Sequence, residues 1–248
     1  AVITGTASAF LMAFSGAAAH AASLSGADII ANWTAGNDPL DNGTTGSWTT
    51  SGTSLTGTSN HQGSIVSDFT AMLDYTFSAT HNPGDNDTFG MIFGWTDIDN
   101  HYRVSGSDDY GESGTEPNTV NFGQAGFRVV KVASGVNTLL YTSNTDYTSS
   151  NNYSLKVVAE SGGGFTVTGR NESTNTVLEN QTFTDSMFTS GNVGFYHTFQ
   201  QSSTWFDIDF VQATTPIPSA VPVPASLPLL AFGLGGMTLL ARRKRNAA

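Results

Sequence analysis

The sequence predicts an all-β fold, an antiparallel jelly-roll β-sandwich, with a signal helix before it and a hydrophobic helix after it. Apolar residues alternate with polar ones in segment after segment, which places one face of each strand in a core. Gly, Ser, Thr and Asn crowd the stretches between these segments, as in strands joined by turns. No convincing amphipathic helix interrupts the pattern, so two packed sheets are the expected way to bury it.

The 248 residues suffice for one large sandwich, and no internal repeat or central linker divides them. We therefore expect a signal peptide in residues 1–21 and a β-sandwich domain in residues 22–213. A Pro-rich spacer with a sorting motif follows in residues 214–225. Residues 226–248 are expected to form a hydrophobic helix and a basic tail.

The N-terminal part is predicted to be a secretory signal. Residues 2–19 are apolar or small, and the run ends in Ala19-His20-Ala21, an A-x-A pattern of the kind that signal peptidase cleaves. No basic stretch precedes the apolar run, so we expect the true start to lie upstream of Ala1. A buried N-terminal helix is the alternative.

Strands are predicted where the alternation is clearest. Phe69, Ala71, Leu73, Tyr75 and Phe77 share one face, and the same pattern returns in residues 89–95, 153–157, 193–199 and 206–210. Gly-rich residues 162–164 and polar residues 171–175 each separate two such segments, so we expect a hairpin at both places.

Charge is distributed unevenly along the chain. The net charge is −11, but four of the nine basic residues form the C-terminal cluster Arg242, Arg243, Lys244 and Arg245. The other five basic residues and all twenty acidic residues lie in residues 28–209, which therefore carry a net charge of −15. This charge repels nucleic acid and anionic membranes and favours cations, calcium in particular. With no cysteine, disulfides and thiolate metal sites are excluded.

The C-terminal part combines a proline spacer, an apolar stretch and the basic tail. Residues 226–241 are apolar and Gly-containing, marginal in length for a spanning helix, and the basic cluster would stay on the cytoplasmic side. The motif before this stretch is Val221, Pro222, Val223, Pro224 and Ala225. Together these elements resemble the PEP-CTERM class of sorting signals, in its VPLPA-type variant.

That resemblance implies cleavage by an exosortase, a membrane cysteine protease, during export from a Gram-negative cell. The hydrophobic helix would then be a transient inner-membrane anchor, and the mature protein would lie in the cell envelope, at the outer surface or in the extracellular matrix. A permanent transmembrane helix is the alternative, and it leaves the sidedness unchanged.

Residues 65–211 contain runs that resemble the thrombospondin C-terminal lectin-like module. Residues 85–95 match its acidic cluster and G-hydrophobic-x-F-G-aromatic run, and residues 102–104 match its Y-x-V. Residues 191–195 and 205–210 match the C-terminal end of that module. The resemblance implies a concanavalin-like, laminin-G-like sandwich that binds calcium and extracellular ligands. One departure is clear, because residues 105–109 replace the W-K-Q that usually follows the Y-x-V strand.

Asp85 and Asp87 are the predicted calcium ligands, since calcium takes six to eight hard oxygen ligands and acidic loops beside strand ends supply them. An EF-hand is rejected, because its fifth and twelfth positions would be Phe89 and Thr96. Asp97 lies at the far end of the same predicted strand and belongs to a different place. A solvated turn is the alternative.

Trp95, Tyr102 and Tyr110 are the predicted ligand-binding residues, because exposed aromatic rings are platforms for sugars. Core packing is the alternative for each ring. Catalytic residues are not expected. A glycoside hydrolase needs two carboxylates about 5 to 9.5 Å apart, and neither an E-x-D-x-x-E strand nor a G-x-S-x-G elbow occurs in the sequence.

The expected function is therefore that of an exported, non-catalytic module that binds glycan or another envelope component, with calcium as its cofactor. Expected partners are the exosortase, signal peptidase and extracellular polysaccharide. A structural biofilm or coat component without a soluble ligand is the alternative. A divergent glycoside hydrolase is the third hypothesis.

Overall fold

The computed structural model describes residues 22–37, 47–58, 63–108, 110–112, 120–122, 125–188, 190–198 and 202–212. The predicted signal peptide, proline spacer, sorting motif, hydrophobic helix and basic tail lie outside these residues. Within the described ranges, no helix has the length and apolar character needed to cross a membrane.

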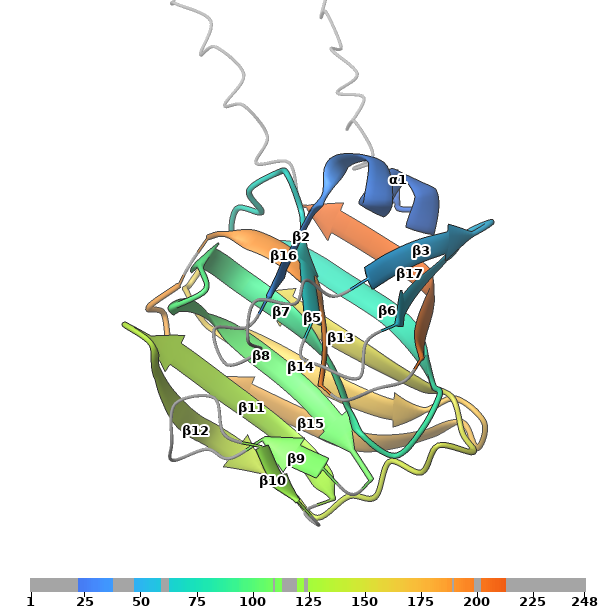
Figure 1. The fold of residues 1–248 in the computed structure, drawn as a ribbon. Coiled ribbons are helices and arrows are strands. Elements are labelled where there is room, and N and C mark those ends of the chain that lie inside the picture. The colour runs from blue at the N-terminus through green and yellow to red at the C-terminus, as the bar shows by residue number, and fades with distance from the viewer. Residues whose placement is uncertain are drawn as a thin grey trace, which may run out of the picture. The chain divides into compact units, whose positions relative to one another are not determined.

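Two antiparallel sheets pack face to face (Figure 1). Sheet A has the strand order β15-β14-β13-β6-β17-β4-β3, and β1 pairs with β17. Its strands are β1 (Ala22–Ser23), β3 (Ser47–Ser51), β4 (Ser54–Thr58), β6 (Tyr75–Pro83), β13 (Tyr153–Ala159), β14 (Phe165–Asn171), β15 (Thr176–Phe183) and β17 (Ser203–Gln212).

Sheet B has the order β12-β11-β8-β7-β16-β5-β2. Its strands are β2 (Thr34–Asn37), β5 (Gly63–Val66), β7 (Thr88–Asp97), β8 (Asn100–Ser107), β11 (Gly126–Ala133), β12 (Val136–Thr142) and β16 (Asn192–Thr198). A two-stranded ribbon joins β9 (Tyr110–Glu112) to β10 (Val120–Phe122). The chain passes repeatedly between the sheets, as from β5 to β6 to β7, so the predicted all-β jelly-roll class is confirmed.

Aromatic side chains fill the space between the sheets. Phe77 and Trp205 point inward from sheet A, and Phe89, Phe127 and Phe195 point inward from sheet B, all of them fully buried. Phe195 lies 5.3 Å from Phe77 and 4.7 Å from Trp205, measured between ring centroids. The predicted aromatic stripes therefore meet in one core.

Both predicted hairpins are confirmed: β13 turns into β14 through residues 160–164, and β14 turns into β15 through residues 172–175. The strand predicted from Phe69 begins only at Tyr75. Asp74 has a φ of 63°, which breaks the extended backbone before β6. Phe69 nevertheless packs inward, 4.8 Å from the ring of Phe210.

The last strand departs from the predicted alternation. Its register against β6 shifts between Phe206 and Asp209, where Asp207 has a φ of 49°. This bulge turns Trp205 into the core and leaves Phe206 only half-buried, so the prediction that Phe206 shares a face with Ile208 and Phe210 is wrong.

The helix α1 (Gly26–Asn32), of seven residues, was not predicted from the sequence. It is too short for a visible period, but its start carries a capping box. The Ser25 hydroxyl accepts from the Asp28 N–H, and the Asp28 carboxylate accepts from the Ser25 N–H. Ile29 is the fully buried apolar side chain of this helix.

Candidate ligand-binding face

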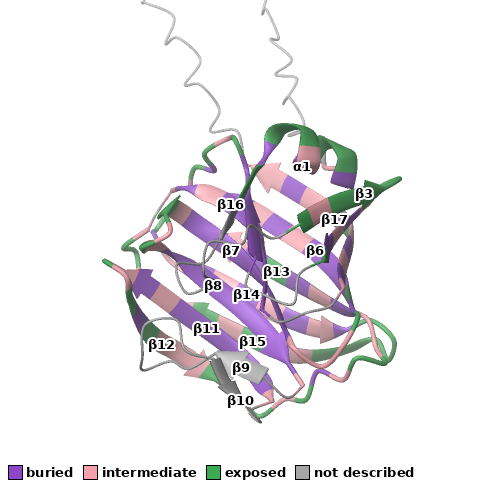
Figure 2. Cartoon of the chain, viewed as in Figure 1, coloured by how far each residue is buried: buried purple, intermediate pink, exposed green. Residues whose placement is uncertain are grey.

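The central strands of sheet B are buried on both faces. Burial is continuous along most of β7, β8 and β16, whereas it alternates along β13 and β14 of sheet A (Figure 2). Since one face of each sheet already forms the core, continuous burial means that the outer face of sheet B is also shielded from bulk solvent.

The residues on this outer face alternate with the core residues of the same strands, and most of them are polar. Their exposed fractions do not exceed 5%. They are Ile92, His101, Arg103, Ser105, Ser107, Arg128, Val130, Val132, Asn137, Tyr196 and Thr198. These described members include no Asp or Glu, so they offer no carboxylate pair for glycoside hydrolysis.

The ribbon of β9 and β10 forms one wall of this face. β9 contacts β7, β8 and β11, and it lies across the lower end of these strands in Figure 1. Tyr110, one of the predicted ligand-binding residues, is the first residue of β9. Its side chain is not among the parts that the structure describes, so its role in ligand binding stays a prediction.

Arg103 occupies the middle of the outer face. Its guanidinium carbon lies 5.0 Å from the centroid of the Tyr196 ring, a cation–π contact between β8 and β16. Its Nη2 donates to Oδ1 of Asn137 at 3.5 Å. Arg128 lies on the neighbouring strand β11, opposite Ser105, and so diagonally next to Arg103. The face therefore holds two planar, multiply donating groups side by side.

His101 continues this row along β8. Its ring lies 4.7 Å from that of Trp95 at 38°, and its Nδ1 lies 3.3 Å from the Asp97 carbonyl oxygen. Burial first, and the charge of Arg103 second, hold the pKa of His101 well below its usual value. The imidazole is therefore neutral at pH 7, with its one N–H at Nδ1 donating to the Asp97 carbonyl oxygen and its Nε2 left as an acceptor.

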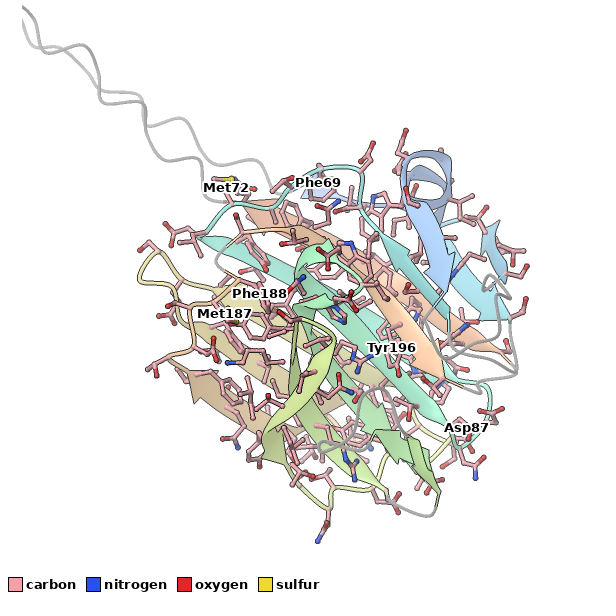
Figure 3. All side chains as sticks on the ribbon, turned by 60° about the vertical axis from the view of Figure 1, so that its left-hand side comes forward. Phe69, Met72, Asp87, Met187, Phe188 and Tyr196 are labelled. Carbon is pink, nitrogen blue, oxygen red and sulfur yellow. The ribbon has the colours of Figure 1, made fainter. Side chains whose placement is uncertain are left out.

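Trp95 lies beside the polar residues of the outer face, and its role as a ligand-binding residue stays a prediction. It is half-buried and packs against a small apolar cluster on the outer face, formed by Val66, Ile92 and Tyr196. In Figure 3 Tyr196 lies between Asp87 and Phe188. An aromatic ring at the rim of a polar face suits the role of a stacking platform.

Tyr102 requires a correction. It is 1% exposed, because its register on β8 points it into the core between its outward neighbours His101 and Arg103. Its ring packs 5.2 Å from Phe93 and 4.8 Å from Phe165, and its hydroxyl donates to Oδ1 of Asp185 at 2.5 Å. The ring is therefore part of the core and offers no face to a sugar.

The predicted calcium ligands lie in the turn between β6 and β7. Asp85 and Asp87 are both half-buried, and the Asp87 N–H donates to Oδ1 of Asp85 at 3.3 Å. The Asp108 N–H donates to the Asn86 carbonyl oxygen at 3.1 Å, which ties this turn to the end of β8. In the part of the chain that the structure describes, no group of three or more His, Cys, Asp or Glu could hold a metal ion. Calcium binding stays a prediction.

Asp97 does not join this turn. It lies at the opposite end of β7, where its Oδ1 accepts from the Asp99 N–H at 2.9 Å and from the Asn100 amide at 2.8 Å. Figure 3 shows Asp87 at the end of the sandwich opposite to Phe69 and Met72. The expected separation of the two acidic clusters is thus observed.

Arg103, Arg128 and Asn137 were not predicted as site residues from the sequence. A signal was present, since Arg103 and Arg128 are two of only five basic residues in a segment with twenty acidic ones. Their meeting on one face depends on the pairing of β8 with β11 and of β7 with β16, strands that are distant in the sequence.

No protein-family model matches the chain, and no curated protein matches its sequence. Solved structures match its fold. The carbohydrate-binding module CBM66 from Bacillus subtilis matches with a TM-score of 0.53 and 17% identity, over 73% of this chain and 96% of that one. The exoplasmic/lumenal domain of VIP36, in a Ca²⁺/Man3GlcNAc-bound form, matches with a TM-score of 0.52 and 14% identity, over 79% and 91%. Both likenesses show a lectin-like sandwich fold.

Proposed function

We propose that the protein is an exported, non-catalytic carbohydrate-binding domain whose ligand face is the outer face of sheet B, and that this face, which is at most 5% exposed in this structure, opens to admit a saccharide. The observation that carries the proposal is the position of Arg103, held between the Tyr196 ring and the Asn137 amide on a polar face. Saccharides offer many hydroxyls and apolar C–H faces, and planar polar side chains beside aromatic rings match both.

Several groups on the same face supply the remaining hydrogen bonds. Neutral His101 offers Nε2 as an acceptor, and Ser105 and Ser107 offer hydroxyls. Trp95 at the rim supplies an apolar ring next to these polar groups. The fold shared with CBM66 and with the Man3GlcNAc-bound VIP36 domain supports a saccharide as the ligand.

We also propose that calcium orders one end of this ligand face. Asp85 and Asp87 supply carboxylates in a turn that is hydrogen-bonded to the end of β8, the strand of Arg103. Calcium bound in this turn would stabilise that end of the ligand face. The calcium-bound form of the VIP36 domain supports the idea of an ion on this fold.

Export and surface attachment rest on the two ends of the sequence. The A-x-A site at Ala19-His20-Ala21 supports cleavage by signal peptidase. The motif of residues 221–225, the apolar stretch and the basic tail support sorting by an exosortase. The protein would then meet polysaccharide outside the inner membrane of a Gram-negative cell.

The test is a glycan array probed with the full chain, with and without calcium, followed by titration of the strongest glycan. Arg103→Gln should weaken binding about 10- to 100-fold, the range for a lost hydrogen bond to a charged group. Arg170→Gln is the matched control, because Arg170 lies on β14 of sheet A. Absence of binding to every glycan in both conditions would contradict the proposal.

A structural coat or biofilm component is the second candidate. The outer face of sheet A favours it, because its side chains satisfy one another in hydroxyl and amide pairs. Thr166 lies 2.9 Å from Thr182, Thr168 donates to Asn180 at 3.1 Å, and Thr56 lies 3.1 Å from Thr204. This candidate predicts a matrix defect on gene deletion without binding to any soluble glycan.

A further inference from the structure

Two histidines from opposite sheets are buried at one end of the core. His81 lies on β6 of sheet A, His197 lies on β16 of sheet B, and both are 0% exposed. The His81 ring stacks on Phe89 at 4.0 Å, and the His197 ring stacks on Trp48 at 4.9 Å. We call these two residues the imidazole pair.

The pair bridges the sheets at close quarters. A Cβ atom added to Gly57, on β4 of sheet A, would come within 2.5 Å of Cε1 of His197. The His197 ring therefore reaches across the core to the backbone of the opposite sheet. Trp205, on β17, packs against the other member, with its ring 4.4 Å from that of His81.

Most ring nitrogens of the pair make no hydrogen bond to the protein. Nε2 of His81 lies 2.6 Å from Oγ of Ser203. Nδ1 of His81 and both nitrogens of His197 are buried without a partner. The pair is held by stacking between aromatic rings, which suits a neutral imidazole and not a charged one.

The groups that face the pair do not compensate a positive charge. His81 is opposite Tyr153 on β13. Phe89, on which the His81 ring stacks, packs in turn against Tyr147. His197 meets Trp48 on β3, Gly57 on β4 and Phe89 on β7. Among these described neighbours, Tyr147 and Tyr153 are the titratable groups, and none is a carboxylate, an ammonium or a guanidinium.

The electrostatics agree with this packing. Burial first, and the charge of His197 second, push the pKa of His81 well below its usual value. Burial lowers the pKa of His197 to about 4.

We propose that the imidazole pair makes the fold acid-sensitive: neutral imidazoles hold the two sheets together at this end of the sandwich, and mild acid destabilises the fold because the unfolded chain takes up the protons that the buried pair excludes. A first proton places a charge in an apolar core. A second proton on the other imidazole adds repulsion between like charges. Both effects disappear when the chain unfolds and the imidazoles meet water.

The direction follows from proton linkage. An imidazole in the unfolded chain has a pKa of about 6.5. Since the folded pKa is lower, the unfolded state binds more protons, and stability is lost as the pH falls below about 6.5. With the folded pKa of His197 near 4, the folding equilibrium constant falls about 30-fold between pH 7.5 and 5.0 through this residue alone.

The experiment is urea unfolding of the full chain at pH 7.5, 6.5, 5.5 and 5.0, followed by tryptophan fluorescence and far-UV circular dichroism. His197→Phe keeps an aromatic ring against Trp48 and breaks no hydrogen bond to the protein, because both nitrogens of His197 lack partners. It should take up about one proton fewer on unfolding and recover about 30-fold of the acid loss. The contribution of His101, which is also buried and neutral, should remain.

Tyr147→Phe is the matched control, because it removes a buried hydroxyl without a partner from a ring that packs against Phe89, the ring on which His81 stacks. It should leave the pH dependence unchanged. Should His197→Phe fail to fold, imidazole NMR signals of the wild-type chain give a second test, with two rings that stay neutral at pH 5. A wild-type stability that is flat from pH 7.5 to 5.0, or rings that titrate near pH 6.5, would overturn the proposal.

Discussion

Glu179 offers a direct test of how the two sheets are joined. It lies on β15 of sheet A and is 5% exposed, yet its partners are hydroxyl groups. Its Oε2 accepts from the Tyr141 hydroxyl at 2.9 Å, and its Oε1 accepts from the hydroxyls of Ser143 and Thr145. These partners belong to β12 and to the connection that carries the chain from sheet B to β13 of sheet A.

Glu179→Gln should destabilise the fold by about 2 to 3 kcal/mol. A hydrogen bond to a charged group contributes about 1.5 to 3 kcal/mol. The glutamine side chain keeps one oxygen as an acceptor, but its NH₂ group replaces the other oxygen and points a donor at a hydroxyl that also donates. Glu179→Ala leaves the donating hydroxyl groups without an acceptor, so it should lower the free energy of unfolding by about 3 to 5 kcal/mol. Urea unfolding at pH 7.5 measures both changes.

Glu172→Gln is the control for the same substitution at an exposed carboxylate. Glu172 accepts from Ser154 at 2.5 Å and pairs with Arg170 at 3.4 Å, but it is solvent-exposed. Its loss should cost less than about 1 kcal/mol. If Glu179→Gln and Glu172→Gln changed the free energy of unfolding equally, the idea that the buried carboxylate secures the sheet-to-sheet connection would be refuted.

Other predictions address packing, the calcium turn and export. Gly57→Ala should lower stability by about 1 to 3 kcal/mol, because its Cβ meets the His197 ring at 2.5 Å. Gly162→Ala, where a Cβ meets nothing within 4 Å, should not, and equal thermal unfolding of the two variants would contradict the packing. Calcium should raise the melting temperature of the full chain, and Asp85→Asn with Asp87→Asn should abolish that rise; a rise that survives both changes would place the ion elsewhere. Changing Pro222 and Pro224 to Ala should leave the C-terminal tail uncleaved in cells, as mass spectrometry of the exported protein would show.

Much of the fold follows from simple patterns in the sequence. A period of two is enough to predict β7, β13 and β16, because the apolar residues on the core face of a strand recur at every second position. Turn chemistry is enough to predict the hairpins at residues 160–164 and 172–175. Both signals are local, and so they survive without knowledge of the strand order.

The failures arise where one residue changes the register or where burial is not one-sided. Asp74 and Asp207 adopt positive φ values that break the alternation at β6 and β17, although nothing in their neighbours requires it. On β8, aromatic Tyr102 faces the core and charged Arg103 faces outward. Because both residues are buried, the sequence alone does not say which face a ligand would meet.

The site shows the same limit of local reasoning. Trp95 could be proposed from the sequence as an aromatic platform, and that role stays a prediction. Arg103, Asn137 and Tyr196 come together only through the pairing of β8 with β11 and β7, of β11 with β12 and of β7 with β16. Such contacts depend on long-range strand order, which one sequence does not state.

The most direct measurement of the central claim is an NMR titration of the isotope-labelled full chain with the glycan that binds best on the array. The proposed ligand face predicts shifts concentrated on β7, β8, β11 and β16, with Arg103 and Tyr196 among the largest, and none on the outer face of sheet A. Shifts confined to β13, β14 and β15, or no shift at saturating glycan, would contradict it.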